Sequence, residues 1–392
     1  MVSNFRSHSM DNVGQLTPLD ETLNHQIADT FATIIESDLG WTEKLWGSFA
    51  RKDGTLQVDF GLGKYHNRNV FDGFGGVSRN TEQWTVRASR ELSFDMQTAG
   101  VGPLRYEVIE PFKKIRFVLA KNDVQPISFD IMFEAELPPF FEKRSRLRTG
   151  NRIGQDVVRY HQAGKLSGWV EVDGERHEID DSWFGFRDHS WGMRGHLIGA
   201  HVTDVQPGSG MPKNMKIHWG LAMMTRPDGS KYEMMNYLFS SDNWNYFSGH
   251  FNEATSNSRE VLQIEIDRMT PKLTFDPKTR RLLGGSLEFG LADGEVRNVE
   301  MTPLGQTGFH LRTGNYGGWN GYRHGAWRGE YHEEGEYIAD VIEKISELGQ
   351  YRDCPVFVRD GDAIGYGIQE TLYVGNYPEL SLGPDSDFLA DL

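Results

Sequence analysis

The sequence of 392 residues predicts an all-β protein built mainly from antiparallel hairpins. The first sign is a set of Asp-Gly pairs, which tolerate positive φ angles and suit tight hairpin turns. These pairs begin at Asp53, Asp72, Asp173, Asp228, Asp293 and Asp360. The second sign is alternation, because Trp219 and Leu221 fall on one face of an extended chain while His218 and Ala222 fall on the other. The 44 glycines also suit the bends of curved sheets, so a β-barrel or β-sandwich is expected.

Two stretches break the strand pattern with helical periodicity. Residues 21–40 are one amphipathic candidate, and residues 337–349 are the other. The later stretch puts five apolar residues on one stripe, namely Ile338, Val341, Ile342, Ile345 and Leu348. Three Asp-Gly turns precede residue 195 and three follow it, which indicates two similar β units with a boundary loop near 195–212. The predicted order is an N-terminal extension with a helix (1–40), a first barrel domain (41–200), a second barrel domain with the late helix (201–378) and an acidic tail (379–392).

Charge and hydropathy limit the partners of this chain. It has 41 Lys and Arg against 56 Asp and Glu, and the net charge of −15 disfavours nucleic acid and anionic membrane surfaces. No stretch approaches the roughly 20 apolar residues that span a bilayer, and the start shows no secretory signal. The single cysteine, Cys354, excludes an internal disulfide and zinc sites built on several thiolates. We therefore expect a cytoplasmic protein with no nucleic-acid partner and no integral membrane segment.

The usual catalytic fingerprints are missing from the sequence. There is no GxxxxGK[ST] loop, no HExxH, no GxSxG elbow, and no GxGxxG that opens a helix after a strand. These absences exclude most nucleotide-dependent and serine-hydrolase functions. Dense clusters of polar and aromatic residues remain as the candidates for chemistry.

The most unusual cluster spans residues 183–196. On an extended strand, Arg187, His189 and Trp191 share one face, and Asp188 lies on the other. The adjacent Asp188 and His189 therefore enter one pocket only if the strand is twisted. One interpretation is that one face lines a cavity and supplies an acid or base. The alternative is that Arg187 and Asp188 pair with neighbouring strands and hold the barrel together.

A second cluster lies in residues 60–92, where polar side chains crowd a short glycine-rich loop. Tyr65, His66 and Asp72 are its candidates for positioning a substrate, because loops on a β scaffold often carry binding residues. An equally good interpretation is a loop in which Asn and Asp side chains satisfy their own backbone.

Two further clusters lie nearer the C-terminus. Residues 316–337 contain Tyr331 and several His and Glu residues, but no pair has tight ligand spacing supported by a second group, so no metal is expected. Residues 365–375 contain Glu370. A carboxyl group in an aromatic pocket has a raised pKa and can act as a general acid, although a solvated outer face is the commoner arrangement. Methionines crowd residues 211–235, as in ordinary core or in a pocket for a bulky lipophilic ligand.

Residues 186–194, FRDHSWGMR, follow the hairpin of residues 168–180, GWVEVDGERHEID. Together they resemble the carotenoid hydratase (hydroxyneurosporene synthase)/AttH-like superfamily, in which a short Arg-Asp-x-Ser-Trp-Gly segment follows a hairpin in the same way. The resemblance covers most of residues 50–375. It implies an all-β fold of two tandem lipocalin-like (calycin) antiparallel β-barrel domains, with a few peripheral helices and a lipophilic pocket. Relatives include hydratases and dehydratases of terpenoid or phenolic alkenes and pericyclic cyclases of polyketides.

The expected function is that of a cofactor-independent lyase or isomerase, of hydratase or dehydratase type. It would use acid/base chemistry on a small lipophilic terpenoid, steroid-like or aromatic substrate. Asp188 and His189 are the expected catalytic residues. Substrate-binding residues are expected at Tyr65, His66, Asp72, Arg187, Trp191, Tyr331 and Glu370. No cofactor and no metal is expected, and a homodimer is left open.

Two alternatives to this function remain open at the level of sequence. One is a non-catalytic carrier of a hydrophobic ligand, whose pocket should hold few titratable groups. The other is a pericyclic polyketide cyclase, which needs shape more than acids. A hydratase should instead place at least one carboxyl group near the centre of its pocket.

Overall fold

The computed structural model shows a chain that is almost entirely β-structure. It describes residues 16–25, 28–30, 33–34, 38–93, 99–149, 151–194, 213–242, 244–254 and 261–384. Strands make up 64% of the structure and helices 6%, which confirms the predicted all-β class. Within the described residues, no helix is long and apolar enough to cross a membrane. The expected boundary loop at 195–212 lies outside them, as does the tail beyond residue 384.

The first sheet is open and curled, with antiparallel neighbours in the order β23-β6-β5-β4-β3-β15-β13-β10-β9-β8-β7. Its strands are β3 (Trp41–Arg51), β4 (Gln57–Tyr65), β5 (Val70–Arg79), β6 (Glu82–Glu91), β7 (Gly100–Val101), β8 (Leu104–Glu110), β9 (Lys114–Leu119), β10 (Ile127–Ala135), β13 (Arg152–Val172), β15 (Trp183–Met193) and β23 (Tyr331–Ile338). Short strands that pair with β13 are β11 (Phe140–Phe141), β12 (Ser145–Thr149) and β14 (Glu175–Ile179).

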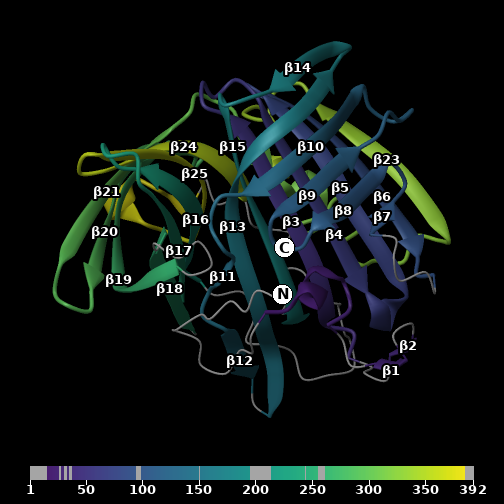
Figure 1. The fold of residues 1–392 in the computed structure, drawn as a ribbon, viewed down its shortest axis with the longest axis horizontal. Coiled ribbons are helices and arrows are strands. Elements are labelled where there is room, and N and C mark those ends of the chain that lie inside the picture. The colour runs from purple at the N-terminus through teal and green to yellow at the C-terminus, as the bar shows by residue number, and fades with distance from the viewer. Residues whose placement is uncertain are drawn as a thin grey trace.

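The second sheet closes into a barrel, because β21 pairs with both β20 and β24. Its strands are β16 (Met215–Thr225), β17 (Lys231–Ser241), β18 (Asn245–Ala254), β19 (Val261–Phe275), β20 (Leu282–Leu291), β21 (Val296–Pro303), β24 (Arg352–Asp360) and β25 (Ala363–Val374), with β22 (Phe309–His310) added to β24. Figure 1 shows the two sheets side by side, with β13 and β15 next to β16 and β25. The tandem β architecture is therefore present, with one closed barrel and one curled sheet.

The outer strand of the first sheet comes from a distant part of the chain. In β23, Tyr331 lies opposite Arg90 of β6, and Ile338 lies opposite Gln83. Figure 1 shows β23, in yellow-green, beside β6 on the side of the sheet away from the closed barrel. The chain thus returns from the barrel to complete the sheet that its own N-terminal half began.

Most of the Asp-Gly pairs form the predicted hairpin turns. Five of them lie between paired strands with the glycine at positive φ, namely Gly54, Gly174, Gly229, Gly294 and Gly361. The pair at Asp72 is different, because it lies inside β5 rather than at a turn. Its carboxylate accepts a hydrogen bond from the backbone N–H of Gly325, at 2.7 Å. A turn dipeptide is tolerated there because β4 and β6 hold β5 in an extended conformation on both sides.

The two predicted helices are largely absent from the described residues. The stretch 21–40 contains the end of a 3-10 turn, η1 (Pro18–Glu21), and a small ladder of β1 (Ala28–Thr30) with β2 (Thr33–Ile34). Its β-branched residues favour an extended chain over a helix. The late stretch forms only a short helix, α1 (Ile345–Leu348), because its start is taken up by β23. The remaining 3-10 turns described are η2 (His66–Arg68), η3 (Leu311–Gly314) and η4 (Pro378–Leu380).

Three apolar layers hold the molecule together. Alternate residues of the first sheet fill its concave face, among them Phe49, Phe60, Phe117, Phe129 and Phe133. The barrel has its own interior, which includes Met224, Met234, Phe251 and Phe289. A third cluster joins the convex face of the first sheet to the outer face of the barrel through Trp46, Phe184, Phe186, Trp219, Leu221 and Ile368. The two faces of β3 and β15 are therefore both buried, and polar residues on the convex face lie at the interface.

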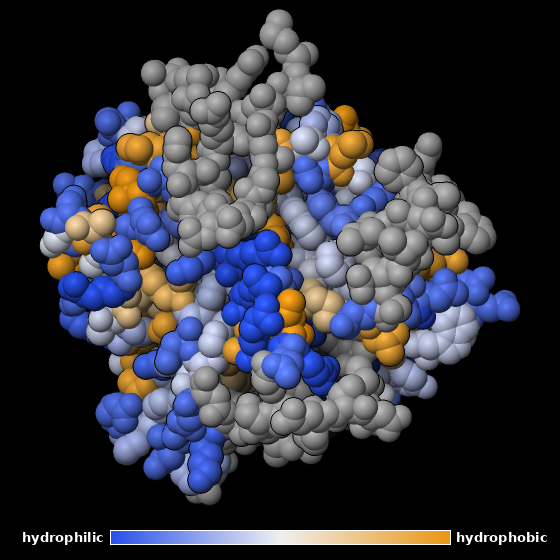
Figure 2. Space-filling model, turned by 90° about the horizontal axis from the view of Figure 1, so that it is seen from below, coloured by the Kyte–Doolittle hydropathy of each residue, from blue (hydrophilic) through white to orange (hydrophobic). Residues whose placement is uncertain are grey.

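The surface that can be followed in Figure 2 is mixed in character. Among the atoms coloured by hydropathy, hydrophobic residues form small patches between hydrophilic ones. The small apolar patches on this face fit a chain that carries a net charge of −15. Whether two copies associate stays a prediction.

Candidate active site

A row of three carboxyl groups lies buried at the interface between the two sheets. Asp59 projects from the convex face of β4, because its neighbours Val58 and Phe60 fill the concave core. Asp353 and Glu370 project from β24 and β25, on the outer face of the barrel. Asp59 and Asp353 are 0% exposed and Glu370 is 6% exposed, so solvent reaches the row only at Glu370.

The three carboxyl groups are neighbours in one row. Asp353 lies between Asp59 and Glu370, so each adjacent pair can share a hydrogen bond when one member is protonated, and Tyr351 lies beside Glu370. The indole Nε1 of Trp46 donates to Asp353 Oδ2 at 2.9 Å. Burial raises the pKa of Asp59, Asp353 and Glu370, and the like charges of neighbouring carboxylates raise those of Asp59 and Glu370 further. A carboxyl group with a raised pKa keeps its proton to a higher pH than an ordinary one, and only a protonated carboxyl can donate a hydrogen bond to its neighbour.

Asp188 faces the same interface and meets a cation there. Its Oδ2 lies 3.3 Å from Arg159 Nε, and the Arg159 side chain is 16% exposed. Arg159 Nη1 also lies 3.3 Å from Glu142 Oε1. Glu142 in turn pairs with His161, at 3.2 Å. Arg159 is therefore shared between two carboxylates, of which Asp188 is the more exposed.

A buried lysine and a group of aromatic rings extend the site along the convex face. Lys44 Nζ lies 4.1 Å from the ring centroid of Tyr316 and has no hydrogen-bond partner, and burial lowers its pKa well below the usual value. The ring of Tyr316 packs edge-on against His324, with centroids 4.6 Å apart. Burial lowers the pKa of His324 to about 4. Its Nδ1 lies 3.9 Å from Asp72 Oδ1, and neither atom has a hydrogen-bond partner.

Buried polar atoms without partners usually mark a strained, catalytic or hydrated site. Here they include the Tyr65 hydroxyl, Asp72 Oδ1, Lys44 Nζ and both ring nitrogens of His324. Glycines at 61, 63 and 76 on the same face let aromatic rings pack directly on the backbone, since an added Cβ would overlap the side chains of Phe74, Tyr65 and Phe309. The interface thus combines carboxyl groups of raised pKa, ion pairs, a buried amine and aromatic walls.

The residues expected from the sequence divide between this interface and other parts of the molecule. Asp188, Glu370, Tyr65 and Asp72 all lie on the interface side, although Tyr65 and Asp72 belong to strands rather than to the loop beside them. His66 lies in η2 and is partly exposed, and burial lowers its pKa to about 4. Tyr331 is 54% exposed on the edge strand β23, where its hydroxyl donates to Glu333.

Three expected residues lie on the opposite, concave face of the first sheet. Arg187 is fully buried and pairs with Glu21, with Arg187 Nη2 2.7 Å from Glu21 Oε1. His189 Nε2 lies 2.9 Å from Glu43 Oε1. The ring of Trp191 stacks on His25, with centroids 3.5 Å apart. Asp188 and His189, the expected catalytic pair, therefore lie on opposite faces of the sheet and do not share a pocket.

Several residues of the interface were not expected from the sequence, among them Lys44, Asp59, Arg159, Tyr316, Tyr351 and Asp353. One signal for them does exist. Asp59 and Asp353 each stand within an otherwise apolar strand pattern, VDFGL and DCPVFV, where an unpaired acid is costly. Partners from other strands offset that cost, and the sequence does not show those partners.

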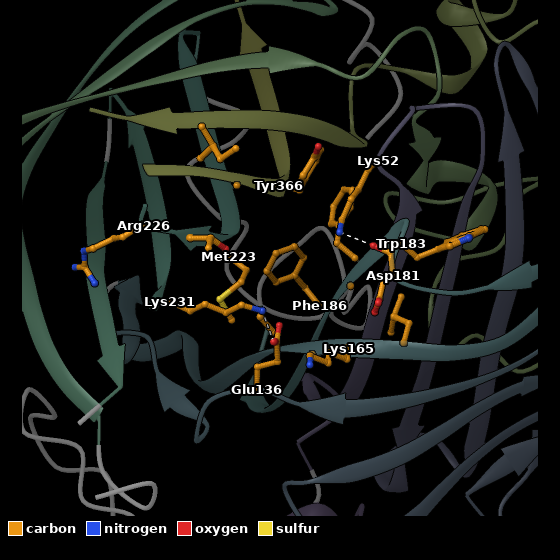
Figure 3. A pocket seen from close by; sticks show the side chains of 18 of the residues that line it. Lys52, Glu136, Lys165, Asp181, Trp183, Phe186, Met223, Arg226, Lys231 and Tyr366 are labelled. Atoms are coloured by element: carbon orange, nitrogen blue, oxygen red, sulfur yellow. Dashed lines mark hydrogen bonds and ion pairs between the residues drawn. The ribbon is translucent and has the colours of Figure 1, made fainter. Parts of the chain in front are cut away.

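A separate cleft of about 540 Å³ opens between β13 and β15 of the first sheet and β16 and β25 of the barrel. In Figure 3, Phe186 and Met223 lie between two polar contacts, one from Lys52 to the backbone oxygen of Asp181 and one from Lys231 to Glu136. Phe186 also belongs to the apolar interface cluster that includes Trp46. The cleft wall is therefore continuous with the apolar layer beside the carboxyl row.

The fold can be compared with solved structures. It is similar to the AttH protein of Nitrosomonas europaea at 12% identity and a TM-score of 0.48, covering 84% of this chain and 92% of that one. It is also similar to kievitone hydratase of Nectria haematococca (13% identity, TM-score 0.44, 90% and 97% covered) and to CghA (10%, 0.46, 96% and 99%). An AttH protein and a hydratase are thus among the solved structures to which the chain is similar.

Comparison at the level of sequence gives a family but no described activity. No curated protein matches the chain. A family model described as a family of unknown function (DUF8625) matches residues 16–382, nearly the whole chain, and the protein belongs to this family.

Proposed function

We propose that the protein is a cofactor-independent enzyme of hydro-lyase or isomerase type that acts on a small lipophilic substrate at the interface between its two sheets. The observation that carries the proposal is the buried row of Asp59, Asp353 and Glu370, in which burial raises the pKa of every carboxyl group. A general acid works best when its pKa lies near the operating pH, and burial of these carboxyl groups moves them in that direction. Aromatic walls beside the row suit an apolar reactant.

Glu370 is the proposed proton donor, because it is the member of the row that solvent reaches. In the hydration direction, its proton passes to one alkene or enol carbon, and positive charge develops on the neighbouring carbon. Water adds to that carbon, and its released proton returns to the Glu370 carboxylate, either directly or through Asp188. If Asp353 instead re-protonates Glu370, the proton that the water releases must end on Asp353, so that the row gains and loses one proton in each turnover. The dehydration direction runs these steps in reverse.

Neighbouring groups would assist the charge changes in this step. The electron-rich faces of Tyr316 and Tyr351 suit a developing cation. Asp188, paired with Arg159, supplies a carboxylate on the same side of the interface. His189 has no place in the proposal, because it lies on the other face of the sheet.

The non-catalytic carrier fits the interface less well. A carrier pocket is expected to hold few titratable groups, whereas this interface holds Glu370, Asp188, Arg159 and Lys44 within one layer. The cleft beside Phe186 does not favour a carrier either, since titratable side chains such as Glu136, Lys231 and Asp362 line it together with the apolar ones.

The test is conversion of terpenoid and phenolic alkenes, and of the matching alcohols, by the purified chain in deuterated water. From an alkene, mass spectrometry should detect the alcohol that is larger by one water and carries one carbon-bound deuterium, and from an alcohol it should detect the alkene that is smaller by one water. Glu370→Gln should bind the same compound and convert it more slowly by roughly 10²–10⁴-fold. Glu300→Gln, on an exposed position of β21, is the matched control and should convert it normally. Binding without conversion by the unmodified chain would identify a carrier instead.

A further inference from the structure

A second cluster of chemical groups lies on the concave face of the first sheet, away from the proposed active site. It consists of His25 Nδ1, Glu43 Oε1 and His189 Nε2, which all lie within 4.8 Å of one another. Glu43 Oε1 lies 2.5 Å from the His25 nitrogen and 2.9 Å from the His189 nitrogen. The side chains of Glu43 and His189 are 0% exposed, and that of His25 is 13% exposed.

Each histidine has its second nitrogen held by another side chain. His25 Nε2 lies 3.0 Å from Asp20 Oδ1, and His189 Nδ1 lies 3.2 Å from the Tyr160 hydroxyl. Such partners are typical of metal-binding histidines, because they fix the ring orientation and the tautomer. The stacking of Trp191 on His25 fixes that ring as well. The two histidines are thus oriented so that one nitrogen of each faces the same carboxylate oxygen.

We propose that His25, Glu43 and His189 bind one divalent metal ion of the zinc type. Two imidazole nitrogens and one carboxylate oxygen are a ligand set that zinc accepts, whereas magnesium and calcium prefer oxygen ligands throughout. The spacing fits, because ligand atoms about 2.0–2.2 Å from a shared ion need separate only modestly from their present distances. Three protein ligands leave a fourth position for water or for the second oxygen of Glu43.

The ion would take the place of the protons that now join these groups. His25 gives up the proton shared between Nδ1 and Glu43 Oε1, and that proton leaves to solvent. His189 keeps its proton but carries it on Nδ1, where the Tyr160 oxygen accepts it. Glu43 stays an anion throughout, and its Oε2 keeps the hydrogen bond from the backbone N–H of His25, at 3.0 Å.

The consequence of binding would be to fasten the N-terminal segment to the sheet. His25 belongs to that segment, while Glu43 and His189 belong to β3 and β15. The pair between Glu21 and Arg187 already ties the same segment to β15. Because Asp59 and Asp188 lie on the other face, this metal site is independent of the proposed proton chemistry.

The experiment is metal binding by the full chain after it has been stripped with a chelator and freed of the chelator. The probes are Zn²⁺ followed by thermal melting and Co²⁺ followed by its visible absorption. We expect one ion per chain, a higher melting temperature with Zn²⁺ than with Mg²⁺, and a Co²⁺ spectrum of low coordination number. Hydrogen exchange in residues 16–25 should slow when Zn²⁺ is bound.

Variants assign the site and separate it from a metal-free ion pair. His25→Gln should weaken Zn²⁺ binding by about 100-fold or more. His177→Gln is the matched control, because His177 lies 3.7 Å from Glu175 without a third ligand, and it should bind Zn²⁺ normally.

If the stripped chain binds no Zn²⁺, or if His25→Gln binds it as tightly as the control, the proposal is overturned. The same holds if His25→Gln lowers the melting temperature equally with chelator and with Zn²⁺, which would leave a hydrogen-bonded ion pair only. His25 is chosen because it is the most exposed of the three ligands, and the Co²⁺ spectrum of the unmodified chain gives a result even if the variant does not fold.

Discussion

Asp188 and His189 are neighbours in the chain, yet they lie on opposite faces of β15. Asp188 Oδ2 is 3.3 Å from Arg159 Nε at the interface with the barrel. His189 Nε2 is 2.9 Å from Glu43 Oε1 on the concave side. The strand therefore connects two separate polar centres, and substitutions at adjacent positions probe different parts of the molecule.

Asp188→Asn should reduce turnover by roughly 10²-fold or more and change the melting temperature little. Stability should survive because Arg159 keeps its ion pair with Glu142. Glu142→Gln is the informative comparison. Glu142 is 1% exposed and pairs with both Arg159 and His161, so its loss should cost about 3–5 kcal/mol of unfolding free energy. Denaturant titration of both variants measures the difference, and equal destabilisation would make Asp188 a structural residue.

Glu233→Gln should change how stability depends on pH. Burial raises the pKa of Glu233 to about 8, and its Oε1 accepts a hydrogen bond from the backbone N–H of Ala163. A raised acid pKa means that the folded state keeps a proton which the unfolded state has lost. Between about pH 4.5 and pH 8 this residue should therefore lower stability as pH rises, by roughly 1.4 kcal/mol per pH unit. The variant resembles the protonated acid and lacks this slope.

The measurement for Glu233 is the melting temperature of both proteins from pH 5 to pH 8.5. The melting temperature of Glu233→Gln should rise relative to that of the unmodified chain as pH increases to 8, and the difference should stay constant at higher pH. Glu300→Gln should follow the unmodified chain throughout. A constant difference between Glu233→Gln and the unmodified chain over the whole range would show that Glu233 is ionised in the folded protein.

Glu21→Gln should destabilise the chain by about 3–5 kcal/mol, because it leaves the guanidinium of Arg187 buried without its carboxylate. Arg187→Leu should lower the free energy of unfolding by a similar amount, because it leaves the carboxylate of Glu21 buried without its cation. In the double variant neither charge remains buried, so its loss should be clearly smaller than the sum of the two single losses. Chemical denaturation of all four proteins gives the coupling energy, and simple additivity would contradict a direct pairing.

The sequence predicted local features of the fold better than long-range ones. Asp173 and Asp293 are read correctly as hairpin turns, because a turn is set by a few adjacent residues. The same dipeptide at Asp72 lies inside β5, where neighbouring strands override the local preference. The stretch around Ile338 has helical spacing, but pairing with β6 makes it a strand. Local pattern carries no information about which distant segment will supply a partner.

The same limit applies to the candidate site. Alternation along β15 was enough to predict that Asp188 and His189 face opposite ways. The carboxyl row could not be predicted, since Trp46 and Asp353 are joined by a hydrogen bond across 307 positions. The His25, Glu43 and His189 cluster was missed for the same reason, because its members come from three separate segments of the chain.

Because β23 is synthesised long after its partner β6, the first sheet cannot be completed until late in translation. Arg87 and Glu334, which form an ion pair between β6 and β23, are 247 positions apart. At about 5–20 residues per second, β6 waits some tens of seconds after its own synthesis before its partner emerges. During that interval the backbone groups of β6 are an open edge, available to any other nascent chain. A chain terminated before residue 331 would keep that edge for good, so premature stop codons should yield aggregates rather than a soluble first half.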